Sequence, residues 1–226
     1  MGTHLNVRLV PVGPGRRLFY AGAEAEADST DEPVGRFEGW TRRLKARWQT
    51  SQGSAARGAR HAWEWLHRRA HPDEPLLSRL RTARSVTLTH PVAMDAQEAA
   101  SAWSAFLVQG RNRHLPWFVV NLLVSPLTVV LALLPGPNIV GYWFVYRAVH
   151  HFLILLGVRR VRRQKIETLF RPAEGSDPSG ADDPDTIAAR LGEAGEDPAH
   201  VREFLKRQGL PPREAADRTN PIPTQT

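Results

Sequence analysis

The sequence predicts a mainly α-helical protein organised around a membrane helical hairpin. Two apolar segments, residues 115–134 and 139–158, each contain about 20 residues, and a helix of that length covers the roughly 30 Å hydrocarbon core of a bilayer. The first segment has no charged residue, and the second has only Arg147. Amphipathic helices and a small N-terminal β-hairpin are expected around this hairpin. The chain has no cysteine, and residues 1–30 lack the apolar core of a signal peptide.

Four residues between the apolar segments predict the hairpin turn: Pro135, Gly136, Pro137 and Asn138. A proline cannot continue a helix, glycine suits the left-handed position just past a helix end, and asparagine caps the next helix. Both outer ends of the hairpin should therefore lie on one side of the membrane. Because Pro126 should kink the first segment, a re-entrant hairpin is an alternative to a spanning one. A hairpin buried in a soluble core is a further alternative.

Charge predicts how this hairpin is oriented. Arg111, Arg113 and His114 precede it, and five basic residues follow it: Arg159, Arg160, Arg162, Arg163 and Lys165. By the positive-inside rule, both termini should face the cytoplasm, or the matrix of a mitochondrion, with the protein in a bacterial or mitochondrial inner membrane. The five basic residues should contact anionic headgroups of the lipid bilayer.

The charge of the whole chain, +7, is concentrated next to the apolar segments. Residues 34–84 carry twelve Lys and Arg against four acidic residues. Within this basic region Trp40 and Trp48 share a helical stripe, where they are expected to contact the membrane surface or, alternatively, the protein's own helices. No nucleic-acid-binding motif is recognised, so nucleic acid is not an expected partner. A protein partner or a homo-oligomer is expected instead.

Pattern and composition divide the chain into six parts. They are an N-terminal strand hairpin with an acidic loop (1–33), a basic Trp-rich helical region (34–110), the membrane hairpin with its flanks (111–165), a flexible linker (166–184), two short C-terminal helices (185–210) and a disordered tail (211–226). Residues 85–89 also read as a strand or an extended link.

No catalytic motif, cofactor motif or metal motif is recognised, so an enzyme is not expected. The candidates for handling ions or protons are Arg147, His150 and His151, which lie within one helical turn. Arg147 could hold an anion or a carboxylate while a histidine exchanges protons. The alternative is that Arg147 extends to a lipid headgroup and both histidines are merely polar. Adjacent helical residues point about 100° apart, so His150 and His151 do not form a two-ligand metal site.

The run Leu134-Pro135-Gly136-Pro137-Asn138, followed by Tyr142-Trp143 and Tyr146-Arg147, resembles the signature of the mitochondrial potassium–proton exchange-related family. The short C-terminal helices in 185–208 are similar to that family's C-terminal region. The resemblance implies membrane association and a link to cation–proton homeostasis. The chain departs from the pattern in its Arg- and Trp-rich section, 36–70, and has no evident presequence. Its composition suits a bacterial relative.

Two functional hypotheses are favoured over a third, a soluble or peripheral enzyme. The first is a membrane-associated protein that supports or regulates potassium–proton exchange. A two-helix hairpin without a second repeat is too small to be a transporter alone, because such machines use paired repeats around a midplane site. The alternative is a membrane-anchored scaffold with no role in transport.

Overall fold

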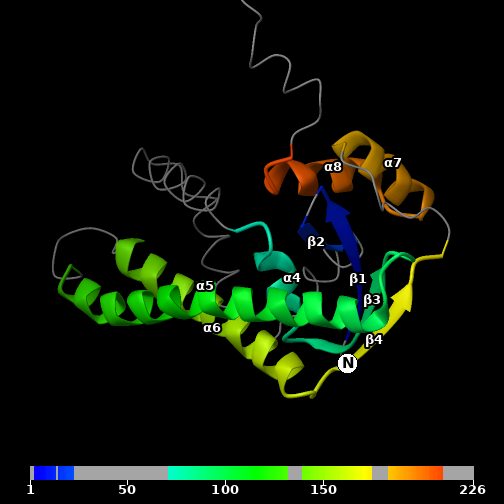
Figure 1. Cartoon of the computed structure of the whole chain (residues 1–226). Coiled ribbons are helices and arrows are strands. Elements are labelled where there is room, and N and C mark those ends of the chain that lie inside the picture. Colours follow the sequence, from blue (N-terminus) through cyan, green and yellow to red (C-terminus); the bar gives the residue numbers. More distant parts are fainter. Residues whose placement is uncertain (1–2, 14, 23–70, 132–138, 175–182, 211–226) are drawn as a thin grey trace, which may run out of the picture.

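The computed structural model describes residues 3–13, 15–22, 71–131, 139–174 and 183–210, and these residues form a mixed α/β fold. A four-stranded sheet lies between two layers of helices (Figure 1). The predicted fold class, a mainly α-helical membrane hairpin protein, is therefore wrong. The strands, in spatial order, are β2 (Arg16–Ala21), β1 (Thr3–Val12), β3 (Ala83–His90) and β4 (Glu167–Pro172).

The N-terminal hairpin forms one half of this sheet. Strands β1 and β2 pair antiparallel, with Leu9 opposite Phe19, and Gly13 and Gly15 adopt positive φ angles of 62° and 82° in the turn. β3 runs parallel to both β1 and β4. Parallel strands need crossover connections, and helices supply the one between β3 and β4. Along β1, Leu5, Val7 and Leu9 are buried on one face of the sheet, whereas Val10 and Val12 are buried on the other face.

Three helices cover one face: α4 (Glu74–Arg79), α5 (Ala96–Leu131) and α6 (Ile139–Arg162). Their shared core contains Leu5, Val7, Leu9, Phe19, Leu76, Leu77, Leu80, Val86, Leu88, Trp103, Phe106, Leu107, Ile154 and Val158. The Trp103 ring centroid lies 5.2 Å from that of Phe19 and 5.4 Å from that of Phe106. This aromatic cluster fixes the first half of α5 on the sheet.

Helices α7 (Pro184–Glu193) and α8 (Pro198–Arg207) cover the opposite face (orange in Figure 1). Asp183 and Asp197 cap them by accepting hydrogen bonds from backbone N–H groups, and a proline begins each helix. Ile187, Leu191, Val201 and Leu205 pack against Val10, Val12, Leu18 and Tyr20. The C-terminal helices expected from the sequence are thus formed, and they belong to the core.

Helices α4 and α6 approach closely at Gly157. A Cβ atom at this position would lie 2.9 Å from the backbone nitrogen of Arg81 and 3.0 Å from the backbone oxygen of Leu77. Only glycine allows these two backbones to come so near each other. This contact fixes how closely α4 packs on α6, and thereby the position of Glu74, the first residue of α4.

The prediction of a membrane-spanning hairpin is wrong. None of the helices in the described ranges is both long enough and apolar enough to cross a bilayer. Apolar residues of the predicted second span, among them Ile154 and Val158, are buried against α4 and the sheet instead. A run of apolar residues is also shielded from water when it packs in a protein core. The predicted turn, Pro135 to Asn138, lies outside the described residues, as do Trp40 and Trp48.

Candidate functional site

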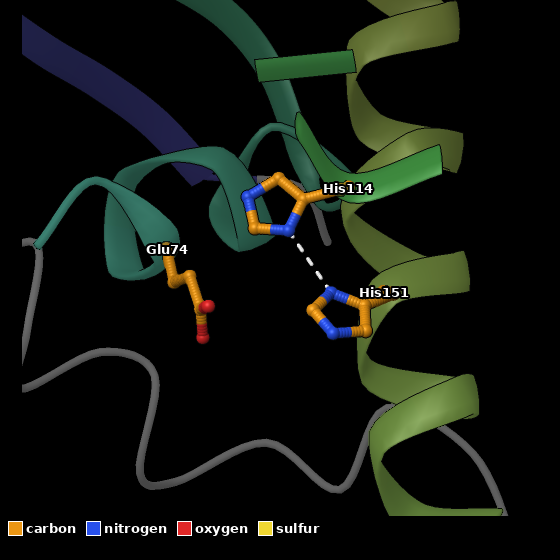
Figure 2. Close-up of side chains that lie close together, drawn as sticks. All are labelled: Glu74, His114 and His151. Atoms are coloured by element: carbon orange, nitrogen blue, oxygen red, sulfur yellow. Dashed lines mark hydrogen bonds between the residues drawn. The ribbon is translucent and has the colours of Figure 1, made fainter. Parts of the chain in front are cut away.

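Three polar side chains converge inside the layer formed by α4, α5 and α6. Glu74 comes from α4, His114 from α5 and His151 from α6, and Figure 2 shows their polar ends directed toward one another. Their exposed fractions are 6%, 1% and 1%. One potential ligand atom from each residue lies within 4.8 Å of the others. We call this group the His–Glu cluster.

The position of Glu74 is set by the start of the short helix α4. Pro75, in the first turn of α4, has a fixed φ that suits a helix start, so α4 begins at Glu74. The Glu74 Oε1 atom accepts a hydrogen bond of 3.3 Å from the backbone N–H of His71. The carboxylate thus interacts with a backbone donor just ahead of its own helix and still extends toward α5 and α6.

Two cationic or polar groups of α6 hold the Glu74 carboxylate. Its Oε2 atom lies 2.9 Å from Nε2 of His150 and 3.4 Å from a guanidinium nitrogen of Arg147. Burial alone would raise the pKa of Glu74, but the hydrogen bond with His150 and the Arg147 charge outweigh burial and lower the pKa to about 2. Glu74 is therefore a carboxylate at neutral pH.

The two buried imidazoles contact each other. The Nδ1 atoms of His114 and His151 are 2.9 Å apart, so in the hydrogen bond one donates and the other accepts. Both Nε2 atoms are buried without a hydrogen-bond partner. Leaving such a polar atom unsatisfied costs about 1–3 kcal/mol. Burial lowers the pKa of His114 to about 4 and that of His151 to about 3, so both rings are neutral at physiological pH.

A second set of polar contacts links the cluster to the other layer of helices. Asp73 Oδ2 lies 3.2 Å from Nδ1 of His71 and 3.6 Å from a guanidinium nitrogen of Arg113. The Gln208 side chain, just past α8, donates a 2.8 Å hydrogen bond to Asp73 Oδ1. Burial alone would raise the pKa of Asp73, but hydrogen bonds with His71 and Gln208 lower it overall.

The structure brings together the three candidates named from the sequence. Arg147 and His150 contact Glu74, and His151 contacts His114. Sequence reasoning missed Glu74 and His114. The available signals were weak: Glu74 stands between prolines in His71-Pro72-Asp73-Glu74-Pro75, and His114 stands at the edge of an apolar run where it reads as part of a basic flank.

The chemistry of the cluster follows from this state of charge. Two neutral imidazoles and an ionised carboxylate are nitrogen and oxygen donors in the protonation state that metal binding requires. The Arg147 guanidinium 3.4 Å away balances the Glu74 charge. The same residues can therefore act as a closed polar network or as ligands.

A second feature lies where α5 and α6 extend beyond the sheet (Figure 1). We call it the apolar arm, and its exposed side chains are Leu115, Trp117, Val119, Val120, Leu122, Leu123, Leu127, Val145 and Phe152. Residues 115–127 carry no charge. Exposed apolar positions form a wide face of this part of α5. A narrower stripe of buried and half-buried residues, His114, Phe118 and Asn121, lies on its other side.

The basic residues after the arm keep part of their predicted arrangement. Arg159, Arg162, Arg163 and Lys165 are exposed. Arg160 is half-buried, and its guanidinium donates a hydrogen bond to the backbone oxygen of Arg81. Four of the five proposed headgroup contacts are therefore accessible, while Arg160 also fixes the end of α4.

Fold and site together define an α/β protein with a covered mixed sheet, a buried His–Glu cluster and an exposed apolar arm. Residues 7–164 match the model of the family described as mitochondrial K+-H+ exchange-related, and since this is more than half of the chain, the chain belongs to that family. The resemblance found in the sequence is thus confirmed, and the family description refers to mitochondria. No curated protein and no solved structure matches the chain.

Proposed function

We propose that this protein supports or regulates potassium–proton exchange at a membrane surface, which it contacts through the apolar arm. Membership in the exchange-related family supports the link to ion exchange. The observation that carries the membrane contact is the arm itself, in which Leu122, Leu123 and Leu127 are 51%, 65% and 68% exposed. Side chains of this kind are normally buried, and a cluster of them marks an interaction surface.

A lipid bilayer suits this surface because of the charges that follow it. Arg159 lies seven residues beyond Phe152 on α6, or about 10 Å along the helix at about 1.5 Å per residue. Cations at that distance from an apolar surface can contact phosphate groups while the arm enters the headgroup boundary. Trp117, 59% exposed, is of the residue type enriched at such boundaries. The proposed arrangement is contact with one leaflet.

Flotation with liposomes tests the membrane contact. The wild-type chain should float with vesicles of phosphatidylcholine and phosphatidylglycerol, and less with phosphatidylcholine alone. Replacing Leu122, Leu123 and Leu127 by Gln should remove at least about 1 kcal/mol of transfer free energy per residue, a loss in partitioning of more than about 100-fold. The control carries V92Q and L169Q, at exposed apolar positions outside the arm, and should bind like wild type. Equal binding of the triple variant would refute the arm as the membrane contact.

A flux assay tests the link to exchange. Membranes from cells that lack the protein should show slow potassium-dependent pH recovery, which added full-length chain restores. Vesicles that contain only the purified chain should show no exchange, because the proposed role is supporting. Exchange by the purified chain alone would contradict this role. Unchanged recovery in the deficient membranes would favour the scaffold hypothesis.

Arg147 is the residue whose exchange to Gln and to Lys best probes the His–Glu cluster in that assay. Arg147→Gln removes the cation beside Glu74, whereas Arg147→Lys keeps the charge and loses the planar guanidinium. If the cluster serves exchange through this ion pair, Gln should reduce recovery more than Lys at equal abundance. Full recovery with the Gln variant would exclude the ion pair from the function.

A further inference from the structure

We propose that Glu74, His114 and His151 form a binding site for one divalent transition-metal ion, with Zn²⁺ as the reference ion. The ligand atoms come from three different helices and lie within 4.8 Å of one another. This inference is independent of the membrane contact proposed above, since it concerns side chains buried between α4, α5 and α6.

The first line of evidence for a metal site is the geometry of the two imidazole rings. Metal–nitrogen bonds of about 2.0–2.1 Å in a tetrahedral site place two ligating nitrogens roughly 3.3 Å apart. The Nδ1 atoms of His114 and His151 are 2.9 Å apart, so a small outward movement of either ring would admit an ion. An ion bound to one nitrogen of each ring would replace the internal hydrogen bond by two bonds to the metal.

The second line of evidence for a metal site is the pair of buried imidazole nitrogens that have no hydrogen-bond partner. Each ring is 1% exposed, and each has an Nε2 atom without a hydrogen-bond partner. Buried polar atoms in native proteins are almost always satisfied, and exceptions call for a cause such as an ion. A ring that turns to place its Nε2 atom on the ion would satisfy this atom, so each ring can supply either nitrogen to one shared ion.

Glu74 retains room for an ion. A carboxylate offers about four lone-pair positions, and three contacts are made, by the backbone of His71 and the side chains of His150 and Arg147. These contacts orient the carboxylate from outside, as groups around a metal ligand usually do. One position therefore remains for the metal.

The donor set selects the kind of ion. Two imidazoles and one carboxylate suit Zn²⁺, Co²⁺ and Fe²⁺, whereas Mg²⁺ and Ca²⁺ prefer sites made only of oxygen. Three protein ligands also leave a fourth tetrahedral position open for water or another small ligand. Potassium is not the ion that this site would take.

The test is a metal titration of the purified full-length chain after treatment with a chelator. Calorimetry should show one Zn²⁺ per chain, Co²⁺ should give the visible absorption of a tetrahedral site, and Mg²⁺ should not bind. H114N, H151N and E74Q should each weaken Zn²⁺ binding by at least about tenfold. H4N changes an exposed histidine of β1 and should bind like wild type.

A measurement on the wild-type chain keeps the inference falsifiable where a variant fails to fold. Zn²⁺ should shift the ¹⁵N ring resonances of two histidines and raise the melting temperature, because an ion that binds only the folded state stabilises it. Absence of stoichiometric Zn²⁺ binding to the folded wild-type chain would overturn the proposal. So would an unchanged Zn²⁺ affinity in a folded H151N variant.

Discussion

Because His114 and His151 are buried as neutral rings, the metal-free protein should lose stability at mildly acidic pH. In the unfolded chain a histidine has a pKa near 6.5, but in the folded protein the pKa is about 4 for His114 and about 3 for His151. Between these limits the unfolded state binds more protons than the folded state. Stability therefore falls as pH decreases from about 7, and the loss continues until the folded rings also become protonated.

The magnitude follows from the same values. Lowering the pH from 7 to 5 stabilises the unfolded state by about 2 kcal/mol for each ring, so the free energy of unfolding should fall by about 4 kcal/mol for the pair. Glu74 adds little in this range, because its pKa is lowered from 4.5 to about 2 and its contribution is lost only as the pH falls below 4.5. The loss at pH 5 is therefore assigned to the histidines.

Urea unfolding with a chelator present measures this effect. The wild-type chain should lose about 4 kcal/mol between pH 7 and pH 5, and the His151→Gln variant only about 2 kcal/mol, since one ring remains. His4→Gln, which changes an exposed ring, should behave as wild type. An identical loss in the His151→Gln and wild-type chains would refute the argument that buried neutral histidines set the pH dependence.

Four further substitutions test the packing of the helices and the sheet by urea unfolding. Gly157→Ala should destabilise the protein by about 1–3 kcal/mol, because the added Cβ meets backbone atoms. Gly110→Ala should destabilise it less, because the added Cβ meets a leucine methyl group that can move. Equal costs for the two substitutions would contradict the close contact between α4 and α6. Trp103→Ala should cost about 3–5 kcal/mol through loss of the aromatic cluster, and a cost below 1 kcal/mol would place this ring outside the core. Arg8→Gln breaks a half-buried pair at 2.9 Å to Glu196 and should cost about 1 kcal/mol at most, with the double substitution of both residues costing little more than the single one.

Local features of the fold were predictable from the sequence alone. The alternation in residues 6–12 and the glycines after it predicted two paired strands, and β1 and β2 are formed there. Asp197 followed by proline predicted the start of α8. These signals depend on residues within a few positions of one another, so they do not require knowledge of the rest of the chain.

Strand β4 shows where local signals fail. Its residues are mostly exposed, because it is the last strand of the sheet and only one neighbour covers it. An edge strand of this kind needs little apolar alternation, so residues 167–172 read as part of a polar linker. The parallel pairing of β3 with β4, and with it the α/β class, was therefore not accessible from the pattern.

The amino-acid sequence by itself determined that the apolar residues of 115–131 and 139–158 lie in two long helices and that Arg147, His150 and His151 share one turn of the second helix. Only the tertiary structure decided where those helices lie and what those side chains contact. Hydrophobicity is non-directional, so an apolar run specifies burial but not whether lipid or the protein core provides it. Glu74, His114 and His151 are 40 and 37 positions apart in the chain, and only the packing of α4, α5 and α6 makes them neighbours.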